Sequence, residues 1–152
     1  MSKQLEDIYN FLPLSDSIAT AGQPTTQQFS DIKAAGYDVV INLALPTSTN
    51  AITNEQQIVE NLGIKYVHIP VIWEKPTLED IERFFAVMEE NADKNVFVHC
   101  AMNMRVSAFV YLYRIIHEQT NIEEAKKSLY QIWQPNETWQ QFIEKVIAYY
   151  QK

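Results

Sequence analysis

The chain has 152 residues, of which 47% are hydrophobic and 20% are charged. This composition can form a hydrophobic core and excludes a disordered or collagen-like chain, and the length predicts one domain over residues 1–152. Twelve basic and nineteen acidic side chains give a net charge of −7, which repels polyanions, so neither nucleic acid nor a membrane is expected as a partner.

Cysteine and histidine content bears on metals and on the cellular compartment. Cys100 is the only cysteine, so no disulfide can close within the chain, and the three histidines show no metal-ligand spacing with it. We therefore expect no metal and no cofactor. The first thirty residues have no basic start and no continuous apolar run, and no apolar stretch of about 18 residues occurs, so neither a signal peptide nor a membrane span is expected. Together with the lone thiol, these features predict a cytoplasmic protein.

Helical and strand patterns alternate along most of the chain. Thr53 and Gln56 form a capping-box pattern that starts a short helix before Gly63, and Thr77 caps the next helix. The apolar spacing predicts further elements in chain order: a helix over 25–35, strands over 38–45, 65–71 and 95–99, and helices over 106–117, 122–133 and 138–150. This alternation predicts an α/β fold of three layers, with a mostly parallel central sheet flanked by helices.

The chain's only cysteine lies between a predicted strand and a predicted helix, in the segment His99-Cys100-Ala101-Met102-Asn103-Met104-Arg105. In open α/β sheets, ligands bind beyond the carboxyl ends of the strands. Backbone N–H groups of such a loop and of the following helix start can bind an oxyanion, and an arginine fork can bind two of its oxygens. The same positive field favours a thiolate. The segment therefore predicts a site that holds phosphate against a nucleophile.

This arrangement resembles the cysteine-based phosphatases of the protein tyrosine phosphatase superfamily, whose signature is His-Cys, five residues, Arg, then Ser or Thr. Here only four residues separate Cys100 from Arg105, and Asn103 stands where the family usually has glycine. Asparagine is the non-glycine residue that best tolerates a left-handed backbone, so Asn103 could close a tight loop.

The four-residue gap is characteristic of a smaller bacterial branch, a phosphatase-like family sometimes fused to metallo-β-lactamase-like hydrolases. Other segments similar to this branch are ATAGQP at 19–24, VVINL at 39–43, HIP at 68–70 and HCAMNMRVSAF at 99–109. The resemblance covers roughly residues 15–115. It implies a protein tyrosine phosphatase-like fold of the dual-specificity type.

Matching positions imply roles for the loop residues. Cys100 would be the nucleophile that forms a phosphocysteine intermediate, and Arg105 would hold the phosphoryl oxygens. The remaining phosphate-binding positions would be Ala101, Met102, Asn103 and Met104.

Three further residues would support the loop. By resemblance, His99 would orient the loop backbone and favour the thiolate, while the Ser107 hydroxyl could donate a hydrogen bond to the sulfur as it leaves. Gln23 would lie near the phosphate loop, although a turn before a helix also accounts for Gln23 and Pro24.

The general acid is open between two carboxylic acids. The superfamily usually supplies an aspartate from a loop after an earlier strand, but the corresponding loop at 71–76 reads VIWEKP, so Glu74 is the first candidate. Asp80 is the second, although it falls in the first turn of the helix capped by Thr77, where an acid also complements the helix dipole.

The function that the resemblance implies is hydrolysis of phosphate monoesters. The substrate would be a phosphorylated protein or small molecule, with phosphotyrosine-like aryl phosphates as the generic class. A rhodanese-like sulfurtransferase is one alternative, because a six-residue loop also suits sulfane-sulfur chemistry. A catalytically weak phosphate- or phosphoprotein-binding module is another, favoured by the shortened loop and the lack of an aspartate at 71–76.

Overall fold

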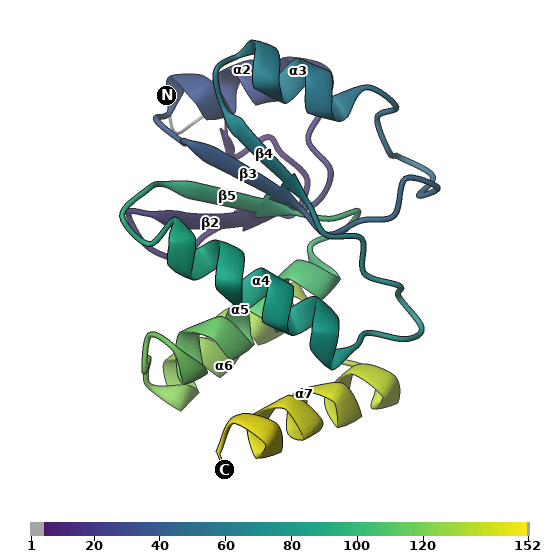
Figure 1. Cartoon of the computed structure of the whole chain (residues 1–152), viewed down its shortest axis with the longest axis vertical. Helices are drawn as coiled ribbons and strands as arrows, with labels where there is room; N and C mark the ends of the chain where they lie inside the picture. The colour runs from purple at the N-terminus through teal and green to yellow at the C-terminus, as the bar shows by residue number, and fades with distance from the viewer. Residues whose placement is uncertain (1–4, 152) are drawn as a thin grey trace.

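A five-stranded sheet forms the middle layer of the molecule (Figure 1). The structure is a computed structural model that describes residues 5–151. The strands are β1 (Leu12–Pro13), β2 (Ile18–Ala21), β3 (Val39–Asn42), β4 (Lys65–His68) and β5 (Val96–His99). Their order across the sheet is β1-β2-β5-β3-β4, and every neighbouring pair is parallel except β1 with β2. The mostly parallel sheet is thus confirmed, with β5 at its centre.

Helices cover both faces of this sheet (Figure 1). One face carries α2 (Thr26–Ala34) and α3 (Glu55–Asn61), and the other carries α4 (Leu78–Glu90), α5 (Met104–Ile116), α6 (Ile122–Ile132) and α7 (Glu137–Tyr150). Successive side chains of a strand point to opposite faces, so Val39 and Ile41 of β3 enter the core beneath the four helices while Val40 packs with α2 and α3. The predicted three-layer architecture is confirmed.

Of the two helix caps predicted from the sequence, one is present. Thr77 caps α4 as predicted, and Thr25 forms a further capping box with Gln28 at the start of α2. The prediction of a capping box at Thr53 and Gln56 is wrong. Helix α3 begins at Glu55 behind Asn54, whose side chain makes no capping bond, and Gln56 instead donates to Glu60 on the next turn.

The strand predictions were too long in two places and missed β1 and β2. The two predicted strands at 38–45 and 65–71 leave the sheet after Asn42 and His68. The apolar residues beyond them pack into the core and keep only single backbone hydrogen bonds to neighbouring segments, such as Val71 N–H to Leu43 O at 3.0 Å. Strand β2 has the sequence IATA, whose small residues give little strand signal, yet all four of its residues are buried beside β5.

No helix within residues 5–151 is long and apolar enough to cross a membrane.

Candidate active site

The loop between β5 and α5 lies at the carboxyl edge of the sheet's central strand. The Cys100 backbone N–H donates to Ala21 O on the neighbouring strand at 3.3 Å, and α5 begins at Met104. Cys100 is 1% exposed and Arg105 is 7% exposed. Both line a cavity of about 160 Å³ whose other walls are Trp73, Ala101, Met102 and Met104. The loop therefore brings the predicted nucleophile and the predicted anion-binding arginine to one cavity.

Two peptide carbonyls of this loop are occupied by groups outside the cavity. Ala101 O accepts hydrogen bonds from the Gln23 backbone N–H at 3.1 Å and from Asn50 Nδ2 at 3.2 Å. Cys100 O lies 3.4 Å from His99 Nδ1, a long hydrogen bond. In a planar trans peptide the N–H points opposite to the C=O. The N–H groups of Ala101 and Met102 therefore face away from these partners, toward the inner side of the loop, where a bound oxyanion would lie.

Asn103 closes the loop in a left-handed conformation, with φ 69° and ψ 2°. Its side-chain Nδ2 donates to Asn10 O at 2.8 Å and to Thr20 Oγ1 at 3.0 Å, which ties the loop to the chain before β1 and to β2. Its Oδ1 is buried and has no hydrogen-bond partner among residues 5–151. Asn103 stands where the superfamily has glycine because it combines the left-handed backbone with this tie.

Gly22 lets the chain after β2 approach the loop closely. A Cβ at this position would lie 2.9 Å from Ala101 O and 2.7 Å from Cδ2 of the Tyr9 ring. Neither distance is compatible with a real Cβ, so the contact of Gly22 with the loop requires glycine. Gly22 also pairs with Met102 through an isolated bridge.

The segment after β4 forms one wall of the cavity. Arg105 Nη1 donates to Val71 O at 2.9 Å, so the guanidinium is anchored to this segment. Trp73 lines the cavity, and its ring packs against Trp133 and Trp139 at centroid distances of 5.3 and 5.7 Å. Trp139 Nε1 also donates to Trp73 O at 2.9 Å. The two C-terminal helices thus support the wall of the site.

The Ser107 hydroxyl makes two hydrogen bonds in this structure. Its hydroxyl donates to Met104 O at 2.8 Å and accepts from Trp133 Nε1 at 3.0 Å. A serine hydroxyl has one proton to donate. In this structure that proton is directed to the backbone of α5, and donation from Ser107 to the Cys100 sulfur as it leaves stays a prediction.

The two candidate general acids have different surroundings. Glu74 is exposed in the turn that follows Trp73 and is not among the residues that line the cavity. The Asp80 carboxylate accepts from the Thr77 backbone N–H at 3.2 Å as part of the capping box of α4. Asp80 is thus held by the helix start, whereas Glu74 is exposed to solvent.

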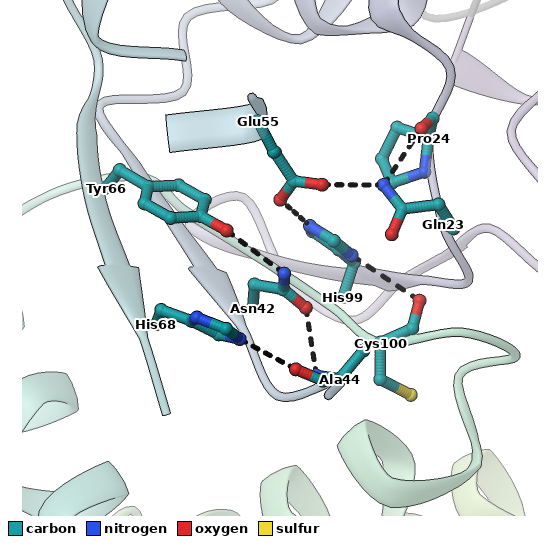
Figure 2. A network of polar contacts seen from close by, with 9 residues as sticks. All are labelled: Gln23, Pro24, Asn42, Ala44, Glu55, Tyr66, His68, His99 and Cys100. Atoms are coloured by element: carbon teal, nitrogen blue, oxygen red, sulfur yellow. Dashed lines mark hydrogen bonds and ion pairs between the residues drawn. The ribbon is translucent and has the colours of Figure 1, made fainter. Parts of the chain in front are cut away.

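His99 and Gln23 meet at a buried carboxylate that the sequence did not reveal. His99 Nε2 lies 2.7 Å from Glu55 Oε2, and Gln23 Nε2 donates to Glu55 Oε1 at 2.7 Å (Figure 2). Burial raises the pKa of Glu55, but the charge of His99 and hydrogen bonds from His99, Gln23 and Tyr66 outweigh it, so the pKa lies below its ordinary value. Glu55 looked like an ordinary acid in the first turn of a helix, and no sequence signal distinguishes it.

No group of three or more His, Cys, Asp or Glu side chains that could hold a metal ion occurs in the described part of the chain, residues 5–151.

A family model described as "DSP-PTPase phosphatase fused to NAD+ Kinase" matches residues 12–145. The chain belongs to this family. The DSP-PTPase family lies within the cysteine-based protein tyrosine phosphatase superfamily, so the resemblance predicted from the His-Cys and Arg positions is confirmed.

Relatives of known sequence and structure agree with membership in the DSP-PTPase family. A DUF442 protein from Shewanella putrefaciens CN-32 is 37% identical, with a TM-score of 0.89 over 99% of both chains. A "Beta-lactamase hydrolase-like protein" from Xylella fastidiosa strain Temecula1 is 28% identical over 116 residues, 74% of this chain. The chain spans about a quarter, 27%, of the length of that curated relative. PTPMT1, solved in complex with PI(5)P, is 13% identical with a TM-score of 0.79 over 93% of this chain and 96% of its own, which shows the fold alone.

Proposed function

We propose that this protein is a cysteine-dependent phosphatase that hydrolyses phosphate monoesters through a phosphocysteine intermediate. The observation that carries the proposal is the cavity that Cys100 and Arg105 both line, at the start of α5 and at the carboxyl edge of the central strand. A helix N-terminus, inward-facing loop N–H groups and a buried guanidinium together form a binding site for a phosphate dianion.

In the proposed reaction, the Cys100 thiolate attacks phosphorus and the bond to the ester oxygen breaks, with a proton passing to that oxygen. Water then attacks the phosphocysteine, which releases inorganic phosphate and regenerates the thiol. Arg105 holds two phosphoryl oxygens through both steps. Its hydrogen bond to Val71 O occupies part of the guanidinium fork, and the remaining N–H groups stay available for phosphate.

We propose Glu74 as the proton donor to the leaving oxygen. It follows Trp73, which lines the cavity, so a small movement of this exposed turn brings the carboxyl group to the mouth of the cavity. Asp80 is the weaker candidate because its carboxylate already caps α4.

The lining of the cavity supports an aromatic leaving group. Apart from Arg105, the walls are apolar or aromatic, with Trp73, Met102 and Met104 around the thiol. Such walls favour a flat apolar ring over a sugar or a second phosphate group. We therefore propose aryl phosphates of the phosphotyrosine type as substrates, with a phosphoinositide such as PI(5)P as the comparison to be tested, because PTPMT1 was solved with that lipid.

Hydrolysis of p-nitrophenyl phosphate from about pH 5 to pH 8 tests the proposal, under reducing conditions and without added metal. We expect turnover by the unaltered protein, none above background with Cys100→Ser, and a loss of about a hundredfold or more with Arg105→Lys, which keeps the charge but lacks the fork. Phosphotyrosine peptide and PI(5)P vesicles are then compared as substrates. Turnover that survives Cys100→Ser refutes the proposal.

A phosphate-binding module is a second candidate, favoured by one observation. Within residues 5–151, the side chains that line the cavity include no carboxylic acid. A module of this kind would bind tungstate or phosphate through Arg105 and show no release of p-nitrophenol even in a single turnover. If turnover is absent, sulfur transfer from thiosulfate to cyanide is measured next, since it separates this module from a sulfurtransferase.

A further inference from the structure

Glu55 and His99 form an ion pair that is almost completely withdrawn from solvent. The exposed fractions of the two side chains are 4% and 0%, and the joining distance is 2.7 Å. Burying a carboxylate is costly unless it is paired and hydrogen-bonded, and Glu55 has partners on both oxygens. Glu60, on the same helix, is exposed. The inward position of Glu55 is therefore a specific feature of the site rather than a general property of α3.

Both ring nitrogens of His99 face hydrogen-bond acceptors. Nε2 faces the Glu55 carboxylate, and Nδ1 faces the backbone carbonyl of Cys100 at 3.4 Å. Both neighbours are hydrogen-bond acceptors. Only the imidazolium form of histidine has a donor on each ring nitrogen, so this form satisfies both contacts. Glu55 supplies the opposite charge that makes a buried imidazolium tolerable.

Glu55 reaches the phosphate loop by two routes. The first route runs through the His99 ring to the carbonyl of Cys100. The second runs through Gln23, whose side chain donates to Glu55 and whose backbone N–H donates to Ala101 O. Figure 2 shows His99 and Gln23 converging on Glu55, while the sulfur of Cys100 points away from His99. One carboxylate thus organises the partners of two successive peptides of the loop without touching the thiol.

We propose that Glu55 is a positioning residue that acts through His99 to fix the first peptide of the phosphate loop, so that the Ala101 N–H is directed at the bound oxyanion. The proposal rests on the proposed phosphate site. Without the carboxylate, His99 loses the partner that orients its ring and balances its charge, and the Cys100 carbonyl is free to rotate. Rotation of that carbonyl turns the Ala101 N–H away from the phosphate.

Glu55→Gln tests the proposal, with Glu60→Gln as the matched control on the same helix. Glutamine keeps the length of the side chain and removes its charge. We measure binding of tungstate, a phosphate-like oxyanion, and the pH dependence of iodoacetamide alkylation, which reports only Cys100 because the chain has no other cysteine. We expect Glu55→Gln to weaken tungstate binding roughly tenfold, the effect of losing a charge-assisted hydrogen bond, and to move the alkylation profile to higher pH. Glu60→Gln should leave both within about twofold.

A double-mutant cycle with His99→Asn separates positioning from simple stabilisation. If Glu55 acts through His99, Glu55→Gln adds little to the loss already caused by His99→Asn. Equal effects of Glu55→Gln and Glu60→Gln, or full additivity with His99→Asn, overturn the proposal. If Glu55→Gln does not fold, His99→Asn alone, which removes the group through which Glu55 acts, should weaken tungstate binding roughly tenfold; no weakening overturns the proposal. Neither readout needs turnover. If the unaltered protein shows no phosphatase activity but Glu55→Gln still weakens tungstate binding, the proposed function is refuted and the positioning role of Glu55 is not.

Discussion

Asn103→Asp distinguishes the tie of the phosphate loop from an ordinary helix cap. Asn103 is the first residue before α5, a position where aspartate is as favourable as asparagine, and a negative charge there gains about 0.3–1 kcal/mol from the helix dipole. Its side chain, however, makes no capping bond and donates from Nδ2 to Asn10 O and Thr20 Oγ1. The substitution preserves shape and replaces this donor with an acceptor.

The donor role should dominate the energetics. Two lost hydrogen bonds amount to about 2 kcal/mol, and a carboxylate left without a charge partner at a residue that is 0% exposed costs about 3 kcal/mol or more. Against a dipole gain of at most about 1 kcal/mol, we expect Asn103→Asp to lower the free energy of unfolding by about 4 kcal/mol or more near neutral pH.

Urea unfolding at pH 7 measures this loss, with Asn136→Asp as the matched control. Asn136 is also a helix cap, but it is exposed and its Oδ1 accepts from the Trp139 backbone N–H, so aspartate can replace it within about 0.5 kcal/mol. The loss in Asn103→Asp should shrink at acidic pH, where a protonated carboxyl regains a donor. Equal stabilities of the two variants at pH 7 would refute the reasoning.

Three further predictions concern the surroundings of the loop. Gly22→Ala should lower the free energy of unfolding by about 1–3 kcal/mol and weaken tungstate binding, because the new Cβ meets Ala101 O. The control Gly36→Ala, which has open space around it but a positive φ, should lower stability and leave tungstate binding unchanged. Equal tungstate affinities of the two variants would contradict this. Trp139→Phe should lower the free energy of unfolding by about 0.5–1.5 kcal/mol and raise KM for p-nitrophenyl phosphate, because Trp73 O loses its donor. An unchanged KM would show that the position of Trp73 does not affect substrate binding. The folded-state pKa of Glu55 lies below its ordinary value of 4.5, so the Glu55 carboxylate stabilises the fold above pH 4.5 and this contribution is lost as the pH falls through the folded-state pKa. The free energy of unfolding, measured from pH 6 to pH 3, should therefore depend less steeply on pH in Glu55→Gln; an equal dependence would contradict this.

The sequence predicted the position and the family of the loop better than the contacts that support it. Val96 to Val98 form a continuous apolar run, and the His-Cys and Arg positions follow within one loop, so the strand, the loop and the family could all be predicted from local pattern. The role of Glu55 could not be predicted, because Glu55 and His99 are 44 residues apart in the chain and meet only when α3 packs on the sheet.

The same limit explains the other misses. Strand β2 carries two alanines, which become strand residues through pairing with β5 rather than through their own preference. The contact of the Ser107 hydroxyl with the indole of Trp133, the residue just after α6, could likewise not be predicted from the motif. Long-range contacts of this kind leave no periodic trace in the sequence.

The three tryptophans of the chain, Trp73, Trp133 and Trp139, form one cluster, and one of them lines the cavity. Their emission therefore comes from a single place, beside the thiol. A ligand that enters the cavity changes the environment of the Trp73 ring and, through it, the coupling among the three indoles. Intrinsic fluorescence thus gives this protein a built-in optical reporter of its own site, with which binding can be titrated and its kinetics followed without attaching a dye.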